Sequence, residues 1–205
     1  MKQLSAETNS PSWPADLGPT AVYDRVKANL RYLRIDILRK AGYTTLDLAA
    51  AIGSNSDKIK RMEADLKGTV QSFIILLLFY SKLGLNLNEL FAKDFKQEQP
   101  ALRDLTPEER RMILVTTEEQ DLVAWLFCRN LTYLRKTILK SSKMTTDMLA
   151  ATTELAVEQI QRMEKDCKGK ISSAVALLHY YVRRGFQVSA ILSSDLCEGG
   201  EPAYG

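Results

Sequence analysis

Apolar residues recur at intervals of three and four along much of the chain, which is the spacing of one face of an α-helix. Gly42, Gly53 and Gly84 interrupt this pattern at points where a helix can end. Thr44 or Thr45 can cap the helix that follows Gly42, because a hydroxyl accepts a hydrogen bond from a free N–H of the first turn. The pattern predicts five helices between residues 29 and 95, with apolar faces centred on residues 30–38, 48–52, 59–62, 73–83 and 88–91.

The same pattern occurs twice, at a spacing of 101 residues and without a gap. About 25 of the 67 positions from Asn29 to Phe95 are identical in the stretch from Asn130 to Leu196. Two copies of this length are too few and too long for a solenoid, which stacks at least three shorter units. The chain is therefore predicted to contain a duplicated small helical domain.

The second copy lacks two of the glycines that end helices in the first copy. Lys143 stands where the first copy has Gly42, and Glu154 stands where it has Gly53. A residue with a side chain costs about 1 kcal/mol in the left-handed conformation that glycine adopts freely. We therefore expect the turns of the second copy to deviate more than those of the first.

The segments outside the repeats complete the predicted organisation. Residues 1–18 are rich in proline and poor in apolar side chains, which indicates a mobile arm. Thr106, followed by proline and two glutamates, is a strong helix start, and Thr116 begins a second one. The prediction is an all-α protein of two tandem five-helix domains joined by a partly helical linker, divided into an arm (1–18), repeat one (19–95), linker (96–117), repeat two (118–196) and flexible tail (197–205).

The charge is distributed unevenly over these parts. The whole chain carries 28 Lys and Arg against 25 Asp and Glu, a net charge of +3. The two repeated stretches, residues 29–95 and 130–196, together hold +7, and the residues outside them, chiefly those between and after them, hold −4. Each repeat is thus a mildly basic module, which favours an acidic partner.

Several kinds of chemistry are not expected. Three cysteines without a CxxC pair, and a single histidine, cannot form a zinc module, a disulfide framework or a haem-attachment site. No catalytic triad or phosphate-binding glycine loop can be assembled, so we expect no enzyme, cofactor, metal or small-molecule substrate. The first ten residues lack the apolar core of a signal peptide, and the longest apolar run, residues 73–80, is far below the ~20 residues that span a bilayer. A cytoplasmic protein with reduced thiols is predicted.

Three stretches together resemble a known family. Tyr43–Gly53, Ile59–Glu63 and Leu76–Phe91 are similar to the Cro-like, XRE-type helix-turn-helix family of phage and bacterial repressors, and both repeats fit its frame over about two-thirds of the chain. The family usually has a glutamine after the capping threonine of its second helix, where this chain has Thr45 and Thr146.

The resemblance implies a DNA-binding surface on each repeat, because the family places its third helix in the major groove and its second across the backbone. Groove-facing positions would be Ser56, Asp57, Lys60 and Arg61 in repeat one, and Val157, Glu158, Gln161 and Arg162 in repeat two. Phosphate contacts would come from Thr44, Thr45, Thr145 and Thr146 at the starts of the second helices. Lysines that could neutralise the backbone are Lys58, Lys67, Lys165, Lys168 and Lys170.

The predicted function is therefore a double-stranded DNA-binding transcriptional regulator, in which two divergent domains act as a covalent pseudo-dimer on an asymmetric operator. The alternative is a degenerate helix-turn-helix scaffold that binds a protein partner or a second copy without DNA, favoured by the acids Asp57, Glu154 and Glu158. An antitoxin or a phage-derived accessory factor would share the same fold.

A few recurring or isolated residues have structural interpretations. Arg34 and Glu63 recur as Arg135 and Glu164, and we expect each pair to be an ion pair between the first and third helices. His179, in the apolar fourth helix of repeat two, is predicted to be a core or interface side chain rather than a catalytic base.

Overall fold

The computed structural model describes residues 19–139 and 143–198. The predicted arm (1–18) and most of the predicted tail (197–205) lie outside these ranges. All regular elements within the described residues are helices, so the all-α class is confirmed. None of the described helices is long and apolar enough to cross a membrane.

The first repeat contains the five predicted helices, and its first helix is longer than predicted. That helix begins at Pro19, because Val22 and Val26 extend the buried stripe towards the N-terminus from Leu30. Its last part is more widely wound, and the N–H of Arg39 bonds to the carbonyl of Arg34, five residues back. The elements are α1 (Pro19–Tyr32), η1 (Leu33–Leu38), α2 (Thr45–Ala51), α3 (Ser56–Asp65), α4 (Val70–Lys82) and α5 (Glu89–Ala92).

The second repeat has the same order of elements. They are α7 (Thr117–Tyr133), η2 (Leu134–Leu139), α8 (Thr146–Thr153), α9 (Val157–Asp166), α10 (Ile171–Val182) and α11 (Val188–Ser193). Thr116 begins a helix, as predicted, and this helix runs through Trp125 into the repeat.

A buried asparagine explains one of the identities between the repeats. The Asn29 amide donates to the carbonyls of Leu90 (3.0 Å) and Lys93 (2.7 Å), and its oxygen accepts from the N–H of Phe95 (3.1 Å). Asn130 makes the equivalent three bonds to Ile191, Ser194 and Leu196, at 2.8, 2.7 and 3.0 Å. Each asparagine satisfies the carbonyl groups at the end of the last helix of its repeat, which would otherwise be buried without partners.

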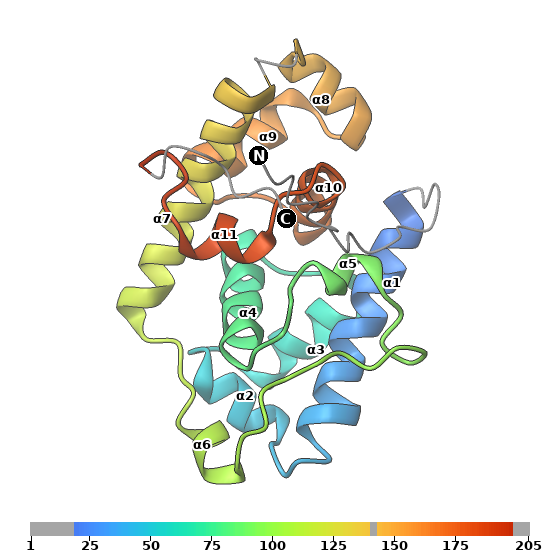
Figure 1. Ribbon diagram of the computed structural model, residues 1–205, viewed down its shortest axis with the longest axis vertical. Helices are drawn as coiled ribbons and strands as arrows, with labels where there is room; N and C mark the ends of the chain where they lie inside the picture. Colours follow the sequence, from blue (N-terminus) through green and yellow to red (C-terminus); the bar gives the residue numbers. More distant parts are fainter. Residues whose placement is uncertain (1–18, 140–142, 199–205) are drawn as a thin grey trace, which may run out of the picture.

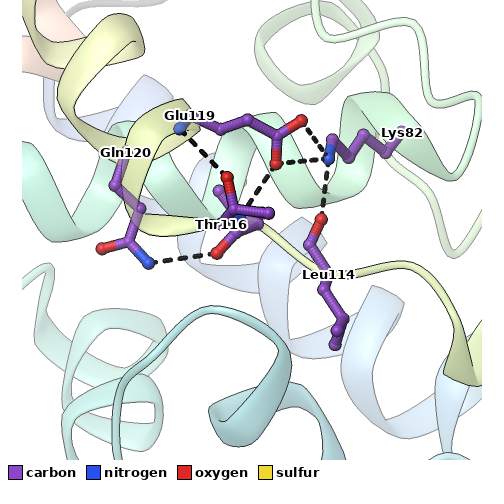
Figure 2. A network of polar contacts seen from close by, with 6 residues as sticks. Lys82, Leu114, Thr116, Glu119 and Gln120 are labelled. Atoms are coloured by element: carbon purple, nitrogen blue, oxygen red, sulfur yellow. Dashed lines mark hydrogen bonds and ion pairs between the residues drawn. The ribbon is translucent and has the colours of Figure 1, made fainter.

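The linker is partly helical, as predicted, and is fastened to repeat one. It contains α6 (Pro107–Arg111), which Thr106 and Glu109 start with a capping box. Further along, Lys82 of α4 donates to the Leu114 carbonyl (2.7 Å) and to both carboxylate oxygens of Glu119 (2.5 and 2.7 Å), as Figure 2 shows. The N–H of Val115 bonds to the carbonyl of Ala51 (2.8 Å), at the end of α2.

Buried side chains of both repeats form one continuous hydrophobic cluster. The helix contacts between repeats are reciprocal: α1 packs against α10, and its counterpart α7 packs against α4, the counterpart of α10. In Figure 1, α2 and α8 lie towards opposite ends of the molecule, with α4 and α10 between them. Reciprocal contacts of this kind characterise the interface of a twofold-symmetric dimer.

Candidate nucleic-acid interface

The first candidate surface is the α2–turn–α3 unit of repeat one. The Thr44 hydroxyl accepts from the N–H of Asp47 (3.2 Å), and the Asp47 carboxylate accepts from the N–H of Thr44 (2.7 Å). Gly53 takes a left-handed conformation (φ 60°) in the turn, and Asn55 caps α3 by accepting from the N–H of Lys58 (2.9 Å). Local sequence therefore specifies both helix starts and the turn between them.

The second unit keeps the same turn in spite of its altered sequence. Glu154 adopts φ 55°, close to that of Gly53, and Lys143 adopts φ 59° where Gly42 has φ 76°. The expectation that the turns of repeat two deviate more is therefore wrong at these two positions. The packing of the helices on either side imposes the left-handed conformation, and the side chains at these positions make it more costly.

Each third helix is fixed to the first helix by a buried ion pair, as predicted. Arg34 Nε lies 2.7 Å from Glu63 Oε2, and Arg135 Nε lies 2.6 Å from Glu164 Oε1. Burial raises the pKa of Glu63, although its hydrogen bond from Arg34 acts in the opposite direction. The hydrogen bond from Arg135 to Glu164 raises the pKa of that guanidinium.

These ion pairs also engage two of the threonines that the sequence assigned to phosphate. Arg34 Nη1 donates to the Thr45 hydroxyl, and Arg135 Nη1 donates to the Thr146 hydroxyl, both at 3.2 Å. Thr45 and Thr146 are half-buried, so they orient the arginines in addition to any contact with a ligand. Thr44 and Thr145 are exposed, and their hydroxyls cap α2 and α8.

The start of each second helix has a different charge environment. In repeat one the Asp47 carboxylate already occupies the N-terminus of α2, where it would repel a phosphate; its hydrogen bonds from Thr44 lower its pKa. Met148 stands at the equivalent position in repeat two. There a hollow of about 470 Å³ adjoins the start of α8, and its lining includes Arg135, Lys136 and Lys143.

The remaining predicted residues lie at or near the surface of the third helices and the turns that follow. Ser56 and Val157 are half-buried. The exposed members are Asp57, Lys58, Lys60, Arg61, Lys67, Glu158, Gln161, Arg162, Lys165, Lys168 and Lys170. In repeat one, Lys58, Arg61 and Lys67 line a hollow of about 240 Å³ beside the turn into α4.

The segments that connect the third helix to the fourth helix in each repeat meet one another. Thr69 and Lys170, which occupy equivalent positions in the repeats, pair as an isolated antiparallel β-bridge. A Cβ atom on Gly68 would lie 3.1 Å from Ile171 of the other repeat, so glycine permits the close approach on that side. The structure thus brings the segments that follow the two third helices together at one point.

The charges on these segments are mainly positive. Residues 56–69 and 157–170 expose eight lysines and arginines and four acids. Three of the acids contact neighbouring lysines: Asp57 lies 3.9 Å from Lys60, Asp65 3.0 Å from Lys67, and Asp166 3.6 Å from Lys168. Glu63 and Glu164 add no exposed charge, because both are buried against arginines.

Sequence reasoning missed three features of this region. The Thr44–Asp47 capping box was readable from the Thr-x-x-Asp spacing. The basic side chains Lys136 and Lys143 beside α8 gave no periodic signal, since they belong to different elements. The contact between the segments that follow the two third helices depends on packing across the repeats, which the local pattern does not encode.

No family model, curated protein or solved structure matches the chain.

Proposed function

We propose that the chain binds double-stranded DNA with both repeats, as a covalent pseudo-dimer of helix-turn-helix domains that regulates transcription. The observation that carries this proposal is the bridge between Thr69 and Lys170 in the segments that follow the two third helices, with exposed cations on the third helix of each side. Helix-turn-helix dimers present two such helices to successive turns of the major groove, about 34 Å apart.

The two third helices would read different half-sites. Lys60 and Arg61 in α3 correspond to Gln161 and Arg162 in α9. Arginine and lysine favour guanine, whereas glutamine favours adenine. The operator of this chain is therefore expected to be asymmetric, because its two half-sites differ in sequence.

The test combines selection of bound DNA from a random pool with a salt titration of the selected site. Replacing Arg61 and Arg162 together by alanine should weaken binding by about tenfold or more. If a replaced arginine contacts a phosphate, its loss should also reduce the slope of log K against log salt by about one unit. The control is Arg103→Ala, which removes an exposed cation from the linker, outside both third helices.

Absence of any enriched sequence, with no retardation of duplex DNA at low salt, would refute DNA binding. A control variant that weakens binding as much as the double variant would refute the assignment of the surface.

One observation favours the scaffold alternative. Leu46 is 71% exposed on α2 and Met148 is 50% exposed on α8, so each second helix presents an apolar side chain. Under that alternative, DNA selection fails while the chain still captures a protein partner through these helices.

A further inference from the structure

Two cysteines of repeat two converge on one backbone oxygen. The Cys128 thiol of α7 donates to the carbonyl of Met163 at 3.2 Å, and the N–H of Cys167 donates to the same carbonyl at 3.1 Å. Cys167 is the C-cap residue of α9, in the left-handed conformation (φ 54°). The Met163 carbonyl therefore holds the two residues next to each other, although 39 positions separate them in the sequence.

The two thiols differ in environment. Cys128 is half-buried and Cys167 is buried. A hydrogen bond between the two side chains lowers the pKa of Cys128; it raises the pKa of Cys167, as does burial. The accessible thiol is thus the one that more readily forms the nucleophilic thiolate, and the buried one lies behind it.

We propose that Cys128 and Cys167 form a redox-active dithiol, a modification site that a hydroperoxide converts to an intramolecular disulfide. The Cys128 thiolate attacks the terminal peroxide oxygen and breaks the O–O bond; the alcohol leaves with the proton from the thiol, and Cys128 becomes a sulfenic acid. The Cys167 thiol then attacks the Cys128 sulfur, forms the S–S bond and releases water. The two thiols lose two electrons in total, which reduce one peroxide to alcohol and water.

The pair is specific to the second repeat. The equivalent positions in repeat one are Lys27 and Leu66. The bond would connect α7 to the end of α9, directly before the turn at Lys168 that leads to the bridge with Thr69. An effect of this bond on DNA affinity rests on the proposed function, but formation of the bond does not.

The experiment treats the reduced full-length protein with a few equivalents of hydrogen peroxide, blocks the remaining thiols, and identifies linked peptides by mass spectrometry. A peptide linked through Cys128 and Cys167 should appear about tenfold faster than any link to the exposed Cys197, and dithiothreitol should reverse it. In Cys167→Ser the link is lost and Cys128 proceeds to sulfinic acid, whereas Cys197→Ser behaves like the parent protein.

Two results would overturn the proposal: full alkylation of Cys128 and Cys167 after peroxide treatment, or a link that forms faster in urea than in the native protein. Circular dichroism of each variant separates a lost link from lost folding. Because the readout is a linked peptide, it gives the same answer whether or not the chain retards DNA.

Discussion

At the scale of single residues, each position in one repeat can be compared with the equivalent position in the other. Gly53 and Glu154 occupy the same left-handed position in the turn between the second and third helices. In the ion pairs Arg34–Glu63 and Arg135–Glu164, by contrast, both repeats keep the same two residues. Arg34 donates to both carboxylate oxygens through Nε, and Arg135 donates to them through Nε and Nη2. A buried carboxylate without its arginine costs several kcal/mol, so neither member of such a pair is replaced easily.

We expect Glu154→Gly to stabilise the protein by about 1 kcal/mol, because glycine adopts φ 55° without the steric cost of a side chain. The reciprocal change Gly53→Glu should destabilise it by at least as much, since its Cβ atom would also lie 3.1 Å from the amide nitrogen of Gln120. Urea denaturation of both variants measures the two differences. Equal stability of Glu154→Gly and the parent would show that the turn relaxes around the glutamate.

At the scale of helices and their connections, the linker acts as a strap between α4 and α7. Figure 2 shows its polar contacts: Lys82 holds Leu114 and Glu119, and Glu119 also accepts from the N–H of Thr116. The pKa of Glu119 is lowered; burial opposes this shift, and the hydrogen bonds from Lys82 and Thr116 produce it. The strap reaches the end of α2 through Val115, so it also supports the turn between α2 and α3.

Lys82→Met should release this strap at a cost of about 1 kcal/mol, because the Leu114 carbonyl and the Glu119 carboxylate both lose a donor. Hydrogen exchange of residues 112–120 is expected to accelerate, while exchange in α10 stays as in the parent. Lys93→Met is the matched control, since Lys93 also contacts two carboxylates, Glu89 at 3.2 Å and Glu98 at 2.6 Å, but holds no part of residues 112–120. Unchanged exchange in Lys82→Met would mean that the backbone bond of Val115 is sufficient.

The elements could be predicted from the sequence to the extent that their signals are local. Helix caps at Thr44, Thr106 and Thr116 and the stop at Gly53 follow from side chains within four residues of the helix end. The start of α1 was missed, because Val22 and Val26 continue a stripe across a stretch that lies outside the repeated sequence. The engagement of Thr45 and Thr146 by arginines was missed because it joins residues from two helices.

At the scale of the whole molecule, the repeats share one continuous core and do not pack as separate bodies. His179 of α10 lies in this shared region, close enough to the charges of Arg183 and of Arg25, on α1 of the other repeat, for both to affect its titration. Burial, together with these two arginines, lowers the pKa of His179 to about 4. The prediction of a core or interface imidazole agrees with its half-buried position.

The pKa of His179 gives the protein a defined dependence on pH. Since the folded pKa is below the ordinary value of 6.5, the unfolded chain binds more protons between pH 6.5 and 4. The free energy of unfolding should therefore fall as the pH decreases through that window, by roughly 1–2 kcal/mol after allowance for partial exposure. Denaturation at pH 7 and pH 4.5 measures the fall.

His179→Leu copies Leu78, the residue at this position in repeat one, and should remove that part of the pH dependence. Leu78→His should add a similar dependence on the other side of the core. An unchanged pH profile in His179→Leu would assign the dependence to other groups.

The bridge between Thr69 and Lys170 also bears on how the two halves diverged. In an assembly of two identical subunits, a residue on the twofold axis meets its own copy, so a lysine there would face a lysine and be repelled. In this chain a lysine faces a threonine across the same point. Covalent joining therefore permits pairs that symmetry would forbid, and each half can acquire a substitution without its mirror image appearing opposite.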